Sequence, residues 1–441
     1  MPDGEFMLFG TQTINAAGHL EIGGCDTVAL AATFGTPLYV VDEAHVRERC
    51  RQYKESFAQL LPNVTVCFAS KALITTALCR IIEQEGLHLE VSSAGELYTA
   101  MQAQFPPQRM LLHGNYKLDQ ELEMALDLGL SRIVVDSLGE LHRLADLAQQ
   151  RHTTADIYLR LVPGVKPQTH SRIQTGQVDT KFGLHIGTGE AMEGIRFAQE
   201  ADSLNLHGLH CHIGSQMFEL DGFARAVDIM VDFMAQVRTE LGLVFGELDL
   251  GGGLGIAYTT EDAAPPVSDL ADVVAWALEH ALKRHDYPMP ALILEPGRSI
   301  VGTAGTTLYR VGPVKQIPGV RTYLAVDGGL SDNPRPALYD AQYSALVANR
   351  ADQRRTLPVR IVGRHCETDT LIDEVALAPA QEGDIIAVFC TGAYNYSMAS
   401  NYNRFPRPAM VLVKDGQADL IVRRESLDDL VRQDVIPERL Q

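Results

Sequence analysis

Features that mark secreted and membrane proteins are missing from this sequence. Its 441 residues contain no apolar run of about eighteen residues, the length needed for a membrane-spanning helix. A basic segment followed by an apolar one is also absent from its start. We therefore expect neither a membrane span nor a secretory signal, and we expect a cytoplasmic protein.

Cysteine is scarce and lacks the spacing of a metal or disulfide framework. The seven cysteines are an odd number, and no two of them form a CxxC pair. This argues against a disulfide-stabilised fold and against a structural zinc site. We expect most of these cysteines to be reduced residues of a core.

Positive charge is in short supply as well. The chain has 37 lysines and arginines against 56 acidic residues, a formal net charge of −19. Long-range repulsion opposes binding to nucleic acid and to anionic membranes, and no clustered basic stripe overrides it. Small molecules and other protein chains remain as expected partners.

Eight short apolar runs alternate with helix-length amphipathic stretches. Most of the runs end at a glycine, a charged residue or a reactive side chain, as barrel strands do at their catalytic ends. The runs are Val64–Ser70, Leu87–Ser92, Arg109–Leu112, Arg132–Asp136, Ile157–Val162, Leu204–His212, Leu248–Leu250 and Ala291–Leu294. Eight alternations predict an α/β fold with a (β/α)8 TIM-type barrel, whose chemistry gathers at the carboxyl ends of the strands.

The ends of the chain have a different pattern. Strand-like pieces such as Glu5–Phe9 and Pro37–Val41 precede the first amphipathic helix, Glu43–Gln59. After about residue 305 the pattern is again one of strands and turns: Thr307–Val311, Arg321–Val326, Val359–Gly363, Asp384–Phe389 and Ala409–Lys414. Because the barrel already has eight strands, we predict a barrel over 43–305 and a mainly antiparallel β domain built from 1–42 and 306–441.

Lys71 is the first chemical candidate. It follows the run Val64–Ser70, so its amine would point into the barrel mouth. Partial desolvation there disfavours the ammonium form and makes the amine available as a nucleophile. A simple ion-pair role is the stronger interpretation when Lys71 is considered alone.

Two further segments follow late strands. Gly251-Gly252-Gly253-Leu254-Gly255 offers backbone N–H groups without Cβ atoms, as phosphate-binding loops of barrels do, although a plain tight turn is an equal alternative. Glu295-Pro296-Gly297-Arg298 places a carboxylate and a guanidinium at the last strand end. If the ligand is pyridoxal 5′-phosphate, a carboxylate keeps its ring nitrogen protonated; the alternative is a surface ion pair.

The segment His210-Cys211-His212-Ile213-Gly214-Ser215-Gln216 sends both histidines to one face of a strand. Two histidines invite a zinc hypothesis, but no third ligand accompanies them in the motif, so we predict no metal. A flat ring that stacks on a cofactor, with Ser215 as a hydrogen-bond donor, suits the neighbouring motifs better.

Taken together, these motifs resemble a known family. Lys71 in FASKA, Lys181-Phe182-Gly183, HCHIGSQ, GGGLG and EPGR look like the alanine-racemase-type barrel decarboxylases that use pyridoxal phosphate. Asp327-Gly328-Gly329, Asp332–Tyr339, Cys366-Glu367 and Gly392-Ala393-Tyr394 narrow the resemblance to the diaminopimelate decarboxylases. The similarity runs from about residue 35 to residue 415 in the same order.

The resemblance implies a role for each matching residue. Lys71 would join covalently to the cofactor, His212 would stack on its ring, and Glu295 would pair with its pyridine nitrogen. The phosphate and its surroundings would be held by Ser215, Gly252, Gly253, Gly297, Arg298 and Tyr394. Substrate contacts would come from Arg298, Arg335, Tyr339, Glu367 and Tyr394, and Cys366 would be the proton donor.

The implied reaction is decarboxylation of meso-2,6-diaminopimelate to L-lysine and CO₂, the last step of lysine biosynthesis, in a homodimer with shared active sites. A carboxylate at the far end of the substrate calls for arginine, which Arg298 and Arg335 supply, and Glu367 suits the far ammonium. The chain departs from the family at Glu90, where Asp is usual, and at Leu73, where Asn is frequent. Asp340 falls where relatives that act on diamines hold the side-chain ammonium.

Three alternatives stay open at this point. A decarboxylase for ornithine, lysine, arginine or carboxynorspermidine would keep the cofactor residues and change the contacts to the far end of the substrate. A racemase of the same barrel class should lack the Cys366-Glu367 pair. A catalytically dead regulator should have lost Lys71 or Cys366, and both are present.

Overall fold

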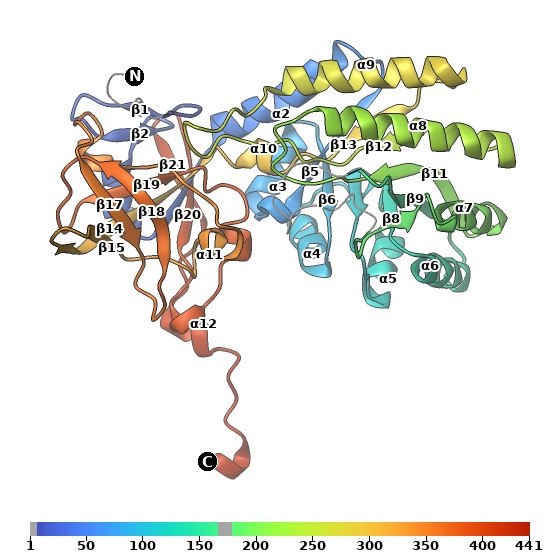
Figure 1. Ribbon diagram of the computed structural model, residues 1–441. Helices are drawn as coiled ribbons and strands as arrows, with labels where there is room; N and C mark the ends of the chain where they lie inside the picture. The colour runs from blue at the N-terminus through green and yellow to red at the C-terminus, as the bar shows by residue number, and fades with distance from the viewer. Residues whose placement is uncertain (1–6, 166–178) are drawn as a thin grey trace. The chain divides into compact units, whose positions relative to one another are not determined.

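The computed structural model describes residues 7–165 and 179–441 (Figure 1). The chain divides into two compact units. We call Arg47–Ile256 with Ala263–Ile300 the barrel unit, and Met1–Val46 with Ala257–Asp262 and Val301–Gln441 the β unit.

The barrel unit contains a closed ring of eight parallel strands. In chain order these are β5 (Val64–Ala69), β6 (His88–Val91), β7 (Met110–Leu112), β8 (Arg132–Val135), β9 (Ala155–Val162), β11 (Leu204–Cys211), β12 (Glu247–Asp249) and β13 (Ala291–Leu294). Pairing of β8 with β9 and of β13 with β5 closes the ring. The predicted (β/α)8 barrel is confirmed. The pattern did not predict the short strand β10 (Leu184–His185), which pairs in parallel with the end of β9.

Helices alternate with these strands along the chain (Figure 1). They are α2 (Glu43–Ala58), α3 (Thr76–Gln84), α4 (Ala94–Gln102), α5 (Asp119–Leu128), α6 (Leu138–Gln150), α7 (Glu190–Glu200), α8 (Asp221–Leu241), α9 (Val267–His285) and α10 (Arg298–Val301). The side chains of Thr75, Ser93 and Ser137 cap α3, α4 and α6 by accepting a backbone N–H three residues ahead. These caps fix where the chain turns from the end of a strand into a helix.

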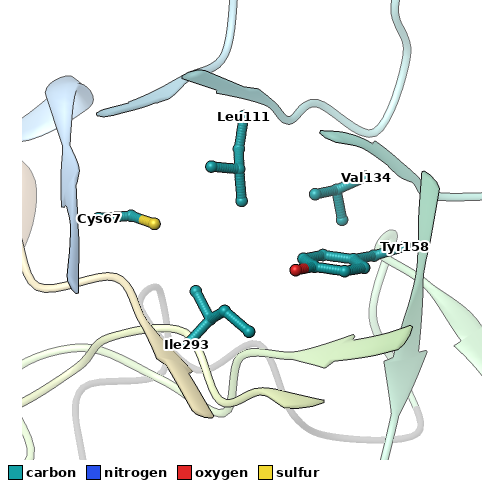
Figure 2. Packing of buried hydrophobic residues seen from close by; sticks show 5 residues of the cluster. All are labelled: Cys67, Leu111, Val134, Tyr158 and Ile293. Atoms are coloured by element: carbon teal, nitrogen blue, oxygen red, sulfur yellow. The ribbon is translucent and has the colours of Figure 1, made fainter. Parts of the chain in front are cut away.

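Apolar side chains fill the interior of the barrel. Cys67, Leu111, Val134, Tyr158 and Ile293, each from a different strand, point toward one another and are at most 5% exposed (Figure 2). Such a layer leaves no channel along the axis. In a barrel filled in this way, ligands bind at the carboxyl ends of the strands.

The β unit is built on a mainly antiparallel sheet. Its strands are β4 (Leu38–Asp42), β14 (Gly305–Ile317), β15 (Arg321–Val326), β16 (Ala345–Val347), β17 (Leu357–Val362), β18 (Thr370–Leu377), β19 (Ile385–Phe389), β20 (Ala409–Lys414) and β21 (Gln417–Val422). The early strand β4 lies between β14 and β20, antiparallel to the first and parallel to the second. The predicted α/β class with a second, mainly antiparallel β domain is confirmed.

One predicted strand is wrong. Residues 5 and 6 of the expected strand Glu5–Phe9 lie outside the described residues, and residues 7–9 form no strand. A small antiparallel sheet of β1 (Thr13–Ile14), β2 (Leu20–Ile22) and β3 (Cys25–Asp26) follows instead, and it leads into helix α1 (Thr27–Phe34). Alternation over five residues is too short to distinguish a strand from an extended lead-in to a turn.

All seven cysteines are free, six of them buried and Cys366 exposed. None of the helices within residues 7–165 and 179–441 is both long and apolar enough to cross a membrane.

Candidate functional site

Most of the predicted site residues of the barrel unit follow the carboxyl ends of its strands. Lys71 lies in a short 3-10 turn (Ser70–Ala72) directly after β5, and His212 follows β11. Gly252 and Gly253 lie in the loop after β12, and Glu295 follows β13. The barrel thus gathers residues that are up to 224 positions apart (295 − 71) at one end.

The amine of Lys71 is directed by a carboxylate. Its Nζ lies 3.1 and 3.2 Å from the two oxygens of Glu90, which is fully buried in β6. The Ser92 hydroxyl donates a 2.8 Å hydrogen bond to the same carboxylate. Glu90 is therefore a site residue that was noted in the sequence only as a departure from the family pattern.

Glu295 is a buried carboxylate held by two imidazoles. Its oxygens lie 2.6 Å from His113 Nε2 and 3.1 Å from His210 Nε2, and all three side chains are at most 6% exposed. Although burial alone would raise it, the two histidines hold the pKa of Glu295 well below its usual range. Burial lowers the pKa of His210 to about 4, so this ring is neutral and Glu295 is anionic at neutral pH.

His113 was not assigned a role from the sequence. The motif His113-Gly114-Asn115 directly follows β7, so its position at a strand end was the signal that could have placed it in the site. It packs edge to face against His210 with ring centroids 4.9 Å apart. His113 thus contacts both His210, from β11, and Glu295, which follows β13.

The same three residues form a group of potential metal ligands, with ligand atoms within 4.8 Å of one another. Atoms bound to one zinc ion at about 2.0–2.1 Å in tetrahedral geometry lie about 3.3 Å apart. The 2.6 Å separation between His113 Nε2 and Glu295 is shorter than this and falls at hydrogen-bond distance. The spacing is that of a direct contact between the His113 ring and the carboxylate rather than that of two ligands of one ion.

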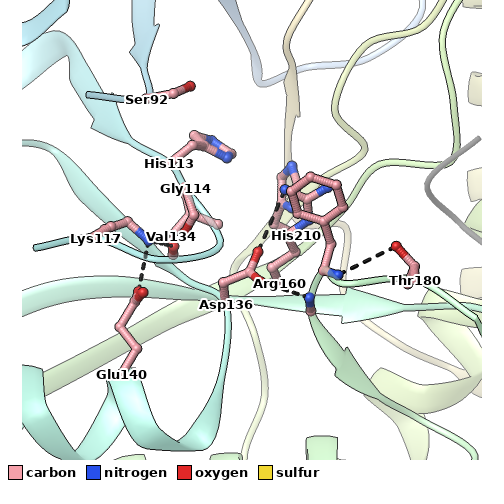
Figure 3. Close-up of polar contacts among 12 residues, drawn as sticks. Ser92, His113, Gly114, Lys117, Val134, Asp136, Glu140, Arg160, Thr180 and His210 are labelled. Carbon is pink, nitrogen blue, oxygen red and sulfur yellow. Dashed lines mark hydrogen bonds and ion pairs between the residues drawn. The ribbon is translucent and has the colours of Figure 1, made fainter. Parts of the chain in front are cut away.

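A buried lysine fixes the loop that carries His113 (Figure 3). Lys117 Nζ donates to Gly114 O at 2.9 Å, Val134 O at 2.6 Å and Glu140 Oε1 at 2.7 Å. Burial lowers the pKa of Lys117, and the charge of Glu140 opposes this shift. All three ammonium protons have an acceptor, as a buried lysine requires.

The KFG motif lies beside a second buried cation. The Arg160 guanidinium lies 3.6 Å from Asp136 and 4.3 Å from the centroid of the Phe182 ring. The Gly183 N–H donates to the same aspartate at 3.0 Å. Figure 3 shows Asp136, Arg160 and His210 in one view of this network. The motif thus packs its aromatic ring on a guanidinium that adds positive charge near His212.

The glycine loop has the bare backbone that the sequence predicts. A Cβ on Gly252 would lie 2.2 Å from Glu295 O, and one on Gly253, whose φ is +128°, would lie 2.4 Å from Gly214 O. Neither position has room for a side chain. The loop therefore packs its main chain directly against the segments that carry Glu295 and Ser215.

Ser215 and Arg298 meet at this loop. Arg298, the first residue of α10, is 7% exposed and donates a 3.0 Å hydrogen bond to Ser215 Oγ. Gly297, directly before it, packs so closely on Ala69 that a Cβ there would lie 3.0 Å from Ala69 Cβ. A hydroxyl and a guanidinium near glycine main chain form a set of donors suited to an anion.

His212 is half-buried at the end of β11. Burial, together with the charges of Lys71 and Arg160, holds the pKa of its imidazole well below the usual value. The ring is therefore uncharged at neutral pH. A neutral, flat ring beside a reactive amine can stack on an aromatic ligand.

The remaining predicted residues belong to the β unit. Arg335, in α11 (Arg335–Tyr339), is 6% exposed and donates a 2.6 Å hydrogen bond to Tyr343 Oη. Its guanidinium also lies 4.8 Å from the Tyr258 ring centroid, and Tyr394 is close enough to contribute to its charge environment. Two aromatic rings thus hold this guanidinium in one orientation.

Cys366 and Glu367 lie on the surface of the β unit. Asn403 accepts a 3.0 Å hydrogen bond from the Cys366 backbone N–H, and the Tyr402 hydroxyl donates to the Glu367 carboxylate. Tyr339 is half-buried at the end of α11. Tyr402 and Asn403 therefore support the Cys-Glu pair although they lie more than thirty residues further along the chain.

Comparisons with known proteins agree with this arrangement. A family model described as "Pyridoxal-dependent decarboxylase, pyridoxal binding domain" matches residues 43–302. The chain is 47% identical over 427 residues to diaminopimelate decarboxylase of Halalkalibacterium halodurans, covering 97% of each chain. It is 46% identical over 429 residues to that of Bacillus subtilis, covering 97% of this chain and 98% of the relative.

Solved structures give the same result. The crystal structure of diaminopimelate decarboxylase from M. jannaschii in co-complex with L-lysine has a TM-score of 0.92 and 35% identity, covering 99% of this chain and 100% of that one. The Helicobacter pylori diaminopimelate decarboxylase complexed with L-lysine has a TM-score of 0.85 and 30% identity, covering 92% and 98%.

The barrel and the family match over residues 43–302 define the class of protein, a pyridoxal-dependent decarboxylase. Within that class, near full-length identity of 45–47% to curated relatives shows that the chain belongs to the diaminopimelate decarboxylase family.

Proposed function

We propose that this chain decarboxylates meso-2,6-diaminopimelate to L-lysine and CO₂ with pyridoxal 5′-phosphate as cofactor. The observation that carries the proposal is the match over 97% of the chain to diaminopimelate decarboxylases, with Lys71 and Glu295 both at the mouth of the barrel. The reaction is the last step of lysine biosynthesis.

The residues of the barrel mouth fit this cofactor. When bound, pyridoxal phosphate supplies an aldehyde for an amine and a ring that accepts the electron pair left behind as CO₂ departs. Lys71 offers the amine and buried Glu295 offers an anion for the ring nitrogen. Gly252, Gly253, Gly297, Ser215 and Arg298 offer donors and bare main chain for the phosphate, and Tyr394 would complete that set.

Each residue of the barrel has a physical task in this proposal. Glu90 orients the amine of Lys71 and provides a carboxylate that accepts a hydrogen bond from it. Neutral His212 would stack on the ring of the cofactor, and being uncharged it would not oppose the uptake of electrons by that ring. Anionic Glu295 favours a protonated ring nitrogen, because a nearby negative charge stabilises the cation.

The β unit supplies the residues proposed to select the substrate. Diaminopimelate carries a carboxylate and an ammonium at the end that does not react. Arg335, held by Tyr343 and Tyr258, suits the carboxylate, and Glu367 suits the ammonium. Tyr339, Tyr394 and Arg298 are further proposed contacts, and the Cys366 thiol is the proposed donor of the proton that replaces CO₂.

We also propose that the active enzyme is a homodimer whose two sites each take Cys366 and Glu367 from the partner chain. The support is that both residues are exposed in the single chain, while Asn403 and Tyr402 hold them in place. A fixed yet exposed pair of reactive side chains is suited to an interface.

The substrate is tested by incubating the purified protein, supplied with pyridoxal phosphate, with meso-diaminopimelate, ornithine, lysine and arginine in parallel while CO₂ is measured. We expect release from meso-diaminopimelate alone. Lys71→Ala is the control and should release none. Release from ornithine, lysine or arginine at a comparable rate would contradict the proposed substrate.

A further inference from the structure

Asp249 is a fully buried carboxyl group inside the barrel that the proposed mechanism does not use. It ends β12, opposite His210 of β11 and Ile293 of β13. Glu247, two residues earlier, accepts a 2.7 Å hydrogen bond from Tyr158, whose ring points into the barrel (Figure 2). Because strand side chains alternate with a period of two, the Asp249 side chain also points into the barrel.

The hydrogen bonds of Asp249 are incomplete for an ionised carboxylate. Its Oδ1 accepts the Gly251 N–H at 2.8 Å. Its Oδ2 is buried, and no N–H or O–H group of the described residues donates to it. A buried carboxylate oxygen without a donor is costly, whereas a protonated oxygen becomes a donor itself.

The acceptor for such a proton is Glu295. Its backbone N–H donates to Gly251 O at 2.8 Å, and the Gly251 N–H in turn donates to Asp249 Oδ1, so one residue connects the two. The carboxyl groups of Asp249 and Glu295 interact directly. Two neighbouring carboxyl groups in a buried site repel each other when both are ionised, so one of them keeps its proton. Glu295 has two imidazole nitrogens at 2.6 and 3.1 Å, while Asp249 has one backbone N–H. Burial and the charge of Glu295 raise the pKa of Asp249 well above its usual range.

We propose that Asp249 is a protonated carboxylic acid that donates Oδ2–H to Glu295 and thereby fixes Glu295 as the single anionic carboxyl group of the pair. Asp249 is a positioning residue, because it acts through Glu295. Its effect on cofactor binding rests on the proposed function above, whereas its protonation belongs to the folded chain without cofactor.

Protonation is measured first on the wild-type apoprotein, by infrared difference spectroscopy with aspartate labelled by ¹³C at the side-chain carboxyl. The spectrum is taken at pH 8.5, because burial raises the pKa of Asp332 to about 7 and that group is then ionised. We expect the carbonyl band of a protonated aspartic acid, absent in Asp249→Asn. A wild-type spectrum without this band would overturn the inference even if the variant does not fold.

Proton release on unfolding gives a second measurement. The folded pKa of Asp249 is raised, so the folded apoprotein holds a proton that the unfolded chain releases, and stability falls as pH rises. Between pH 8 and 9 we expect wild type to release about one more proton than Asp249→Asn. Glu247→Gln is the matched control on the same strand. Burial would raise the pKa of Glu247, but Arg132 and Tyr158 lower it, so Glu247 is ionised in both the folded and the unfolded chain at this pH. This variant should therefore release as many protons as wild type. Equal release by wild type and Asp249→Asn would contradict the assignment.

Cofactor binding then separates a donor role from simple packing. In Asp249→Asn the amide oxygen can accept from Gly251 and the amide N–H can donate to Glu295, so affinity for pyridoxal phosphate should stay within about threefold of wild type. Asp249→Val has no donor and should bind about 10- to 100-fold more weakly, the usual effect of losing a hydrogen bond to a charged group. Equal affinities for the two variants would overturn the positioning role. CO₂ release by wild type from meso-diaminopimelate reports separately on the proposed function.

Discussion

The amine of Lys71 takes its direction from one buried carboxylate. Glu90 is one methylene longer than the aspartate usual at this position in the family, and it contacts Nζ with both oxygens while Ser92 holds one of them. Leu73, the other departure, is 2% exposed and serves as a core residue. The two departures thus have different consequences, because only Glu90 contacts the reactive amine.

We expect Glu90→Gln to lower kcat/KM about tenfold or more, because Lys71 loses an ionic partner of the kind that contributes about 1.5–3 kcal/mol. Glu90→Asp retains the charge with a shorter reach and should recover part of the activity. Steady-state kinetics and the rate of borohydride trapping at Lys71 check both. If Glu90→Asp is no better than Glu90→Gln, charge is not the property that matters there.

His210 makes the stability of the protein depend on pH. Burial lowers its pKa from the ordinary value of 6.5 to about 4, so the unfolded chain binds a proton that the folded chain excludes. Stability is therefore lost as pH falls from about 6.5 toward 4, by about 1.4 kcal/mol per pH unit for one group. In His210→Gln the amide nitrogen can replace Nε2 but does not titrate. The slope of the unfolding free energy against pH should therefore be smaller in this variant, by the contribution of one proton.

Urea unfolding of the apoprotein at several pH values between 7 and 5 checks this expectation. His152→Gln, a change at an exposed position, controls for the substitution itself. The same slope in wild type and His210→Gln would mean that His210 does not carry the dependence.

At the level of elements, the loop between β7 and α5 is held by a charge pair rather than by apolar packing. Lys117 and Glu140 are both at most 4% exposed, and the lysine also binds the carbonyls of Gly114 and Val134. The loop carries His113, so this pair sets the position of one of the two imidazoles on Glu295. Long-range polar contacts thus connect the helix α6 to the site through one side chain.

Lys117→Met should destabilise the protein by about 3–5 kcal/mol, because it leaves the buried carboxylate of Glu140 without its partner. The double variant Lys117→Met, Glu140→Leu removes the stranded charge and should regain much of that loss. Denaturant unfolding of wild type, single and double variants measures the difference. A double variant as unstable as the single one would show that the carbonyl contacts of Lys117 dominate.

At the level of the whole molecule, the proposed dimer predicts complementation. Lys71→Ala and Cys366→Ala are each expected to be inactive, but a mixed dimer with shared sites contains one site with both residues intact. Random reassociation at equal amounts should restore roughly one quarter of wild-type activity, since half the dimers are mixed and each has one of two sites intact.

The control mixture combines Lys71→Ala with His212→Ala, two lesions proposed to lie on the same side of each site, and it should recover no activity. Activity from the control mixture would refute the proposal that each active site takes Cys366 from the partner chain. So would a Lys71→Ala and Cys366→Ala mixture that recovers no activity. Activity is read as CO₂ release after denaturation and refolding of the mixed chains.

The eight strands of the barrel could be predicted from residue order, because short, mostly apolar runs alternate with helix-length amphipathic stretches eight times. The same pattern predicted which residues lie at the strand ends: Lys71 and Glu295 directly follow such runs, His212 ends one, and Gly252 is two residues beyond Leu250. The resemblance of ordered motifs then predicted the family to which the comparisons assign the chain.

Which of these side chains touch depends on how the chain folds in three dimensions. Nothing in the local pattern of β6, β7 or β12 indicates that Glu90 contacts Lys71, that His113 contacts Glu295, or that the charge of Glu295 acts on Asp249. These contacts depend on closing the barrel, which sets neighbouring strands in register and removes water from between their side chains. Protonation follows from that burial, and so it could not be predicted from residue order alone.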